Sequence, residues 1–158
     1  MNEFMNVAIE LSSDNFEKKY GGPFGACVVK DGKIIGKGKN QVIKNSDPTA
    51  HAEIMAIRNA CETIKSHDLT DCVLYTSCYP CPMCLSAIIW SNIKTVYYGN
   101  TKEDAADIGF RDEMIYDYLE RQTNDRDDDD VLNLKQMNHN EAIKVFERYK
   151  EQEDKIEY

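Results

Sequence analysis

The sequence has no excess of positive charge and no long apolar run. Across its 158 residues, 19 lysines and arginines stand against 28 aspartates and glutamates, which gives a formal net charge of −9. Binding to nucleic acid relies on basic side chains that displace counterions from phosphates, so this charge balance argues against nucleic acid as the main partner. No stretch approaches the roughly 18 consecutive apolar residues that a membrane helix needs.

The N-terminus also lacks the basic and then apolar pattern of a signal peptide, so secretion is not expected. Hydrophobic residues make up 42% of the chain, which is enough to build a packed core. We therefore expect a cytoplasmic protein that binds a small ligand and does not bind a membrane.

The six cysteines are not spaced like a disulfide framework. Three of them stand singly in apolar segments, as buried free thiols usually do. The other three, Cys78, Cys81 and Cys84, follow one another at steps of three residues. In a reducing compartment this spacing favours a metal site over disulfide bonds.

The order of the predicted elements is typical of an α/β protein. The two-residue turn Asp31-Gly32 predicts a hairpin, and Asp47 as a cap with Pro48 at the first helical position predicts the start of a helix. The predicted strands occupy residues 24–30, 33–38, 72–77 and 95–98. The predicted helices occupy residues 3–18 and 49–64, a segment that begins at Pro80, and residues 112–121.

Two successive strand–helix–strand units imply right-handed crossovers and a partly parallel sheet covered by helices. We therefore predict a single α/β domain over residues 1–158, built as a three-layer α/β/α sandwich around a mixed central sheet of about five strands. Residues 131–137 are the candidate for a late edge strand. Asn138 and Glu141 have the spacing of a capping box, which predicts a C-terminal helix and tail over residues 139–158.

Two short motifs supply the ligands of a metal site. His51-Ala52-Glu53 and the segment from Pro80 to Cys84 each open a predicted helix, and Cys81 and Cys84 share one helical face. One imidazole and two thiolates fill three positions of a tetrahedral zinc site and leave the fourth open, as in catalytic sites. Histidine-x-glutamate followed by proline-cysteine-x-x-cysteine is the signature of zinc nucleobase deaminases. The sequence thus predicts one zinc ion per subunit.

Glu53 is the predicted proton carrier of this site. Two thiolates formally cancel the charge of zinc, so the ion acidifies its water less than an all-histidine site would. A carboxylate beside that water can accept its proton and pass it to the departing nitrogen. One alternative remains open in which the protein is not an enzyme. With Cys78 as a fourth ligand the zinc would be structural, and the protein would be an inactive binding module.

On these residues the sequence resembles the cytidine-deaminase-like superfamily and, within it, the bacterial guanine deaminases. The resemblance covers essentially the whole chain. It is carried by Gly21 to Ala26, Asn40, Asp47 to Glu53, Tyr75 to Cys78, Pro80 to Cys84, Asp104 to Ala106, Gly109-Phe110 and Glu157-Tyr158. Cytosine, cytidine and transfer-RNA adenosine deaminases share the zinc motif, and residues 104–112 with the terminal tyrosine favour guanine. Tyr79 departs from the pattern, since many relatives carry glutamate at that position.

The resemblance implies hydrolytic deamination of guanine to xanthine and ammonia, and it assigns further site residues. It implies that Phe24 stacks on the ring, that Asn40 bonds the base edge and that Ala52 belongs to the substrate site. It also implies that Asp112 assists proton transfer at the leaving amino group. Transfer-RNA adenosine, cytosine and other aminated heterocycles remain alternative substrates.

The same resemblance implies a homodimer. In this family the C-terminal segment, here residues 139–158, closes over the pocket and is often exchanged between subunits. Tyr158 would then be a lid residue that contacts the substrate.

Overall fold

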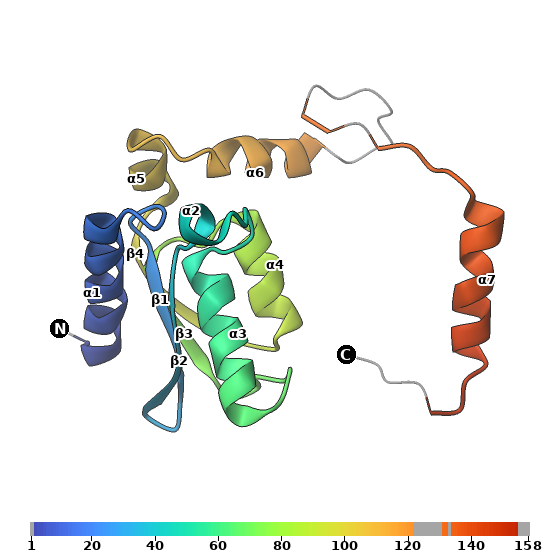
Figure 1. Ribbon diagram of the computed structural model, residues 1–158, viewed down its shortest axis with the longest axis horizontal. Coiled ribbons are helices and arrows are strands. Elements are labelled where there is room, and N and C mark those ends of the chain that lie inside the picture. Colours follow the sequence, from blue (N-terminus) through green and yellow to red (C-terminus); the bar gives the residue numbers. More distant parts are fainter. Residues whose placement is uncertain (1, 122–130, 133, 155–158) are drawn as a thin grey trace. The chain divides into compact units, whose positions relative to one another are not determined.

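The computed structural model describes residues 2–121, 131, 132 and 134–154. Two compact units divide the chain, Met1–Ile115 and Tyr116–Tyr158. The elements, labelled in Figure 1, are α1 (Glu3–Lys18), β1 (Gly25–Lys30), β2 (Lys33–Lys39), α2 (Val42–Asn45), α3 (Ala52–Ile64), β3 (Val73–Cys78), α4 (Pro82–Trp90), β4 (Thr95–Asn100), α5 (Lys102–Asp107), α6 (Asp112–Arg121) and α7 (His139–Lys150). Among the described helices, none combines the length and the apolar character needed to cross a membrane.

The first unit is built on a mixed sheet. Its strand order is β2-β1-β3-β4; β1 pairs antiparallel with both β2 and β3, and β3 pairs parallel with β4. Asp31 and Gly32 both have positive φ, as the predicted two-residue hairpin turn between β1 and β2 requires. The mixed sheet is confirmed, but in the described part of the chain it has four strands where about five were predicted.

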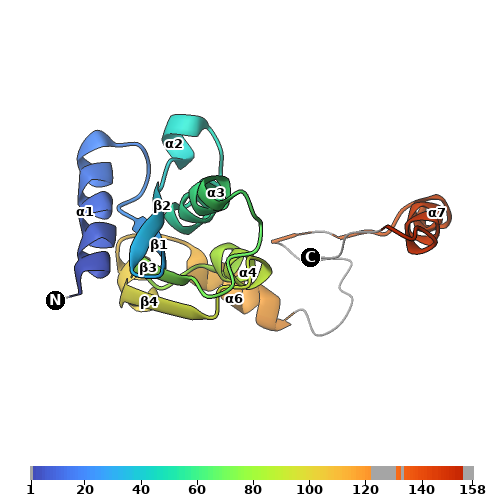
Figure 2. The same cartoon turned by 90° about the horizontal axis from the view of Figure 1, so that it is seen from below.

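Helices cover both faces of this sheet, as Figures 1 and 2 show. On one face, apolar residues of α1 such as Phe4 and Val7 pack against Cys27, Val29 and Tyr75. On the other face, α3 and α4 cover the larger core cluster, which includes Ala26, Val28, Ala52, Ala56, Ala60, Leu74 and Ile88. The prediction of a three-layer α/β/α sandwich is confirmed.

Helix α3 lies in direct contact with the backbone of β2. Gly36 and Gly38 stand on the strand face that meets the helix, and a Cβ atom on Gly38 would overlap the carbonyl oxygen of Ala52. A Cβ atom on Gly36 would overlap the carbonyl oxygen of Ala56 in the same way. Because no side chain separates the two elements, the end of β2 fixes the position of the first turn of α3.

Helix α3 begins three residues later than the sequence predicts, at Ala52. The prediction that Asp47 caps this helix, with Pro48 at its first position, was wrong. The side chain of Asp47 instead accepts hydrogen bonds from the N–H and the hydroxyl group of Thr49, at 2.8 and 2.7 Å, and closes a local turn. An aspartate at a helix cap and an aspartate in such a turn use the same bond to a nearby N–H, so the sequence does not separate them.

Two predictions after residue 130 were wrong. The described residues of the segment 131–137 form no strand. An apolar segment is stable as a strand only when a neighbouring strand pairs with it. Helix α7 forms as predicted, but Asn138 has a φ of 53° and its side chain makes no capping hydrogen bond, so no capping box exists. The backbone carbonyl of Asn138 accepts the bonds from Glu141 and Ala142 instead. Tyr158 lies outside the described residues.

Candidate metal and substrate site

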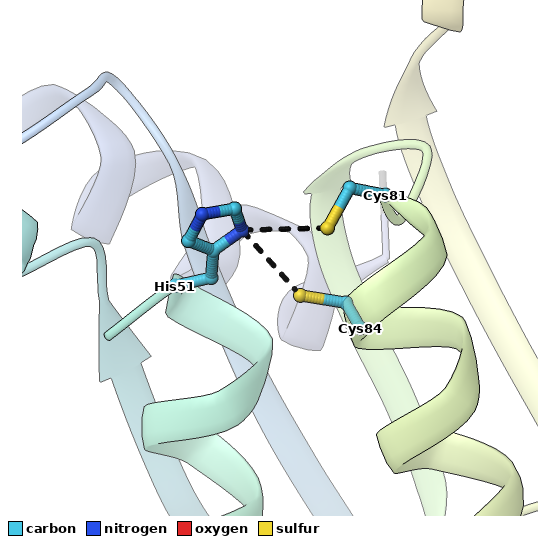
Figure 3. Close-up of side chains that lie close together, drawn as sticks. All are labelled: His51, Cys81 and Cys84. Carbon is cyan, nitrogen blue, oxygen red and sulfur yellow. Dashed lines mark hydrogen bonds between the residues drawn. The ribbon is translucent and has the colours of Figure 1, made fainter. Parts of the chain in front are cut away.

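The N-termini of α3 and α4 present side chains to the same point (Figure 3). His51 is the N-cap of α3, with φ −68° and ψ 158°, and Cys81 is the N-cap of α4, with φ −67° and ψ 167°. Helix α4 thus begins at Pro82 and not at Pro80 as predicted, while Cys84 lies in its first turn. The extended backbone at both caps places the two N-cap side chains ahead of the helix ends, where Cys84 also reaches.

His51, Cys81 and Cys84 form a group that fits one metal ion. Nδ1 of His51 lies 3.4 Å from Sγ of Cys81 and 3.7 Å from Sγ of Cys84, and the three ligand atoms lie within 4.8 Å of one another. Zinc bonds of about 2.0 to 2.3 Å at tetrahedral angles place a nitrogen and a sulfur ligand about 3.6 Å apart. The spacing and the thiolate–imidazole donor set therefore suit zinc.

The protonation of the two cysteines in this group bears on how it binds a cation. A hydrogen bond from Cys84, with a further contribution from His51, lowers the pKa of Cys81, which favours the thiolate form of this sulfur. The same bond to Cys81, together with burial, raises the pKa of the Cys84 thiol. Cys84 therefore gives up its proton when a metal binds, because the thiolate is the form that ligates.

Cys78 is not a member of this group. In the part of the chain that the structure describes, the cluster of possible metal ligands consists of His51, Cys81 and Cys84. The thiol of Cys78 donates a hydrogen bond to the carbonyl oxygen of Thr101 at 3.5 Å, and burial raises its pKa to about 11. A thiol that lies outside the ligand group and is bonded to a backbone carbonyl is poorly placed as a fourth ligand, which argues against the closed structural-zinc site.

Glu53 lies beside the ligand group, in the first turn of α3, and is only 6% exposed. Its Oε1 accepts a hydrogen bond of 2.9 Å from the hydroxyl group of Thr76, and its Oε2 lies 3.4 Å from Sγ of Cys84. Burial raises the pKa of Glu53, which suits a group that must hold a proton for part of a reaction.

The sequence analysis did not identify Thr76 as a site residue. Thr76 lies on the same face of β3 as Leu74 and Cys78, and Leu74 belongs to the core cluster beneath α3. The period of a strand therefore directs the Thr76 hydroxyl into the interior, where it needs a polar partner. That pattern was the available signal, and Glu53 is the partner.

A pocket opens beside the ligand group, and all of its lining residues belong to the first unit. It encloses about 360 Å³, including the space open to solvent, and is lined by Phe24, Asn40, His51, Ala52, Glu53, Cys78, Tyr79, Cys81, Phe110 and Asp112. The structure thus brings together the site residues expected from the sequence. Cys84 belongs to the ligand group but is fully buried and does not line the pocket, and Tyr158 is an exception because it lies outside the described residues.

The pocket has an aromatic wall and a second carboxylate. The rings of Phe24 and Phe110 meet edge to face, with centroids 4.7 Å apart. Asn40 is 4% exposed, and its Oδ1 accepts a hydrogen bond of 3.2 Å from the N–H of Val42. Burial, together with the Cys81 thiolate, raises the pKa of Asp112. Phe110 and Cys78 line the pocket although the sequence analysis gave neither a role in substrate binding, and Tyr79, the departure from the family pattern, lines it too.

Comparison with known proteins places the chain in a family. Residues 1–100, more than half of the chain, match the model of the cytidine and deoxycytidylate deaminase zinc-binding region. The chain belongs to this deaminase family. Over 98% of its length it is 42% identical to the guanine deaminase of Bacillus subtilis, and the match covers 97% of that protein. The X-ray structure of guanine deaminase from Bacillus subtilis has a TM-score of 0.91 and 41% identity, and the match covers 100% of this chain and 99% of that one.

Two other proteins match a shorter part of the chain. The protein NE0047, crystallised with 2,6-diaminopurine, has a TM-score of 0.66 and 35% identity over 69% of this chain and 61% of its own. The tRNA-specific adenosine deaminase of Haemophilus influenzae is 41% identical over 73% of this chain and 67% of its own. The similarity to the Bacillus subtilis protein, in contrast, extends along nearly the whole chain.

Proposed function

We propose that this protein catalyses the zinc-dependent hydrolytic deamination of guanine to xanthine and ammonia. The observation that carries this proposal is the buried Glu53 carboxylate, held by Thr76 beside three metal ligands at an aromatic-walled pocket. Similarity to the Bacillus subtilis guanine deaminase over nearly the whole chain supports guanine as the substrate. So does the 2,6-diaminopurine bound by NE0047, because that base also carries an amino group on C2 of a purine ring.

His51, Cys81 and Cys84 would hold one zinc ion per subunit. The ion supplies Lewis acidity, which makes a water molecule a better nucleophile at neutral pH. The N-termini of α3 and α4, which carry His51 and Cys81 as caps, add partial positive charge at the same place. This charge supports the negative charge that develops on the reacting base.

Glu53 is the proton carrier in this proposal. In the overall reaction the oxygen of water bonds to C2 of guanine, the bond from C2 to the amino nitrogen breaks, and ammonia leaves. One proton of the water remains on the ring and the other leaves with the ammonia, so a nearby group must accept and return protons. A buried carboxylate with a raised pKa suits this task. We assign the assisting transfer at the leaving amino group to Asp112, which lines the same pocket.

The remaining pocket residues bind the base. We assign ring stacking to Phe24, which Phe110 supports from the side, and hydrogen bonding of the base edge to Asn40. Ala52 is the first residue of α3, and the first N–H groups of a helix have no partner within it, so its backbone can also bond the base. Tyr158 completes the proposal as the lid residue.

We also propose that the whole chain, residues 1–158, acts as one catalytic domain in a cytoplasmic homodimer that exchanges residues 139–158. Helix α7 buries none of its residues and exposes the apolar side chains of Val145 and Phe146, which a partner surface would cover. All six cysteines are free, as is usual in a reducing compartment.

Light scattering should give a dimer mass for the full chain and a monomer mass for Phe146→Glu. A monomeric full chain would contradict the exchange.

The experiment that tests the proposed function is ammonia release from guanine, adenine, cytosine and their nucleosides, measured side by side with the zinc-loaded protein. We expect guanine to be the preferred substrate and xanthine to form in an amount equal to the ammonia. Preference for adenine or cytosine would refute guanine as the substrate. Filter binding with transfer RNA at low salt tests the adenosine alternative, and the net charge of −9 predicts no binding.

A further inference from the structure

Asn15 joins two chain segments that carry the proposed base-binding residues. It lies on α1, is completely buried and does not line the pocket. Its side-chain amide nitrogen donates to the carbonyl oxygen of Gly22 at 2.7 Å and to the carbonyl oxygen of Asn40 at 2.8 Å. A single amide group therefore connects the loop before β1 to the residue that follows β2.

Both of these carbonyl groups belong to residues that are bonded through their backbones to Phe24, a residue that lines the pocket. The N–H of Phe24 donates to the carbonyl oxygen of Gly22 at 2.8 Å, and the N–H of Asn40 donates to the carbonyl oxygen of Phe24 at 3.2 Å. A Cβ atom on Gly22 would lie 2.6 Å from the Phe110 ring and 2.7 Å from the Phe24 ring. The bonds of Asn15 therefore act on the backbone that places the aromatic wall against Asn40.

The packing around this connection is tight. A Cβ atom on Gly21 would overlap Oδ1 of Asn40, so the loop backbone lies directly against that side chain. The same Oδ1 accepts the bond from Val42, which fixes the orientation of the Asn40 amide. A shift of the loop relative to β2 must therefore move Asn40 as well.

We propose that Asn15 is a positioning residue for purine binding, which sets the spacing between Phe24 and Asn40. This inference rests on the proposed function, because it assumes that these two residues hold the base. The metal ligands and Glu53 are positioned by α3, α4 and Thr76, to which Asn15 donates no hydrogen bond that the structure describes. Loss of Asn15 therefore weakens binding of the base and leaves the metal site and its proton carrier in place.

The test compares Asn15→Ala with a matched control, Asn59→Ala, in the zinc-loaded full chain. Asn59 makes the same kind of bond, from its amide nitrogen to the carbonyl oxygen of Lys37 at 2.7 Å, on the exposed side of α3. We expect Asn15→Ala to raise the KM for guanine at least tenfold while kcat stays within about twofold and the zinc content is unchanged. Asn59→Ala should leave KM unchanged. An unchanged KM with a lower melting temperature in Asn15→Ala would show a purely structural role and overturn the proposal.

Amide hydrogen exchange gives a second result that does not depend on turnover. In Asn15→Ala, exchange should become faster than in the wild type in residues 20–24 and 40–44 and stay unchanged in α3 and α4. Equal protection of residues 20–24 and 40–44 in Asn15→Ala and the wild type would contradict the positioning role. If Asn15→Ala does not fold, Asn15→Ser takes its place: the serine hydroxyl keeps one hydrogen-bond donor, and the KM for guanine should rise above the wild-type value. A wild-type protein that releases no ammonia from guanine refutes the proposed function, while the exchange pattern still decides whether Asn15 holds the two segments.

Discussion

The hydroxyl group of Thr76 donates a hydrogen bond of 2.9 Å to Oε1 of Glu53, and both side chains are buried. The bond connects β3, one of the two inner strands of the sheet, to the first turn of α3. A carboxylate held in this way has one oxygen fixed by the sheet and the other directed toward Cys84 and the metal ligands. The orientation of Glu53 is thus set by the fold and not by the substrate.

Thr76→Val should impair catalysis without loss of zinc. The change keeps the shape of the side chain but removes the hydrogen bond to a charged group, which is worth about 1.5–3 kcal/mol. We expect kcat to fall about tenfold or more, with one zinc per subunit retained. Thr63→Val is the control, because that hydroxyl bonds a helix carbonyl on the surface. Equal kcat values for the two variants would show that Thr76 does not orient Glu53.

Cys78→Ser and Cys84→Ser should behave differently toward zinc. Cys84 is one of the three residues of the ligand group, so its loss should lower zinc affinity strongly. Cys78 bonds the carbonyl oxygen of Thr101, and serine can keep that bond, so Cys78→Ser should bind a full equivalent of zinc. Titration against a chromophoric chelator measures both affinities. Loss of zinc from Cys78→Ser would restore the structural-zinc alternative.

Gly38→Ala should push α3 away from β2. The added Cβ atom would overlap the carbonyl oxygen of Ala52, next to His51. We expect a loss of about 1–3 kcal/mol in the free energy of unfolding together with weaker zinc binding. Gly32→Ala is the control. It strains a turn at φ 72°, where the Cβ atom meets no neighbour, and should lower stability without changing zinc affinity. Unchanged zinc affinity in Gly38→Ala would mean that this contact does not place the ligand.

Asp14→Asn should make the protein less sensitive to acid. Asp14 on α1 forms ion pairs with Lys39 and Lys18, and the hydrogen bonds from these lysines hold its pKa below the ordinary value of 3.8. A carboxylate with a lowered pKa stabilises the fold above its unfolded-state pKa, and this stabilisation is lost as pH falls through the folded-state pKa. The variant should therefore show a smaller drop in melting temperature between about pH 5 and pH 3. Because the pair is exposed, the difference should be small, and an identical drop would contradict the role of the pair.

The metal ligands could be predicted from the sequence because the chemistry limits the choice. One imidazole and two cysteines three residues apart have few structural uses, and Figure 3 shows the three side chains together. The exact helix starts could not be predicted, because Asp47 makes the same local bond in a turn as it would at a cap. Helix α3 consequently begins three residues late, with His51 as its cap, and α4 begins two residues late, with Cys81 as its cap.

What the sequence did not predict depends on distant contacts. The strand period directs the Thr76 hydroxyl into the interior, but the packing of α3 on β3 decides that its partner is Glu53. The buried bonds of Asn15 likewise depend on where α1 meets the loop before β1. The error at residues 131–137 has the same origin, since an apolar segment becomes a strand only when a neighbour pairs with it.

The measurement that tests the central claim most directly is ammonia release from guanine by Glu53→Gln, with the zinc content determined on the same sample. Glutamine keeps the size of the side chain and can still accept the bond from Thr76, but its amide cannot take up and return a proton at neutral pH. The account predicts one zinc per subunit and a fall in kcat of about 10²- to 10⁴-fold. A zinc-loaded Glu53→Gln protein that turns over guanine at the wild-type rate would contradict it.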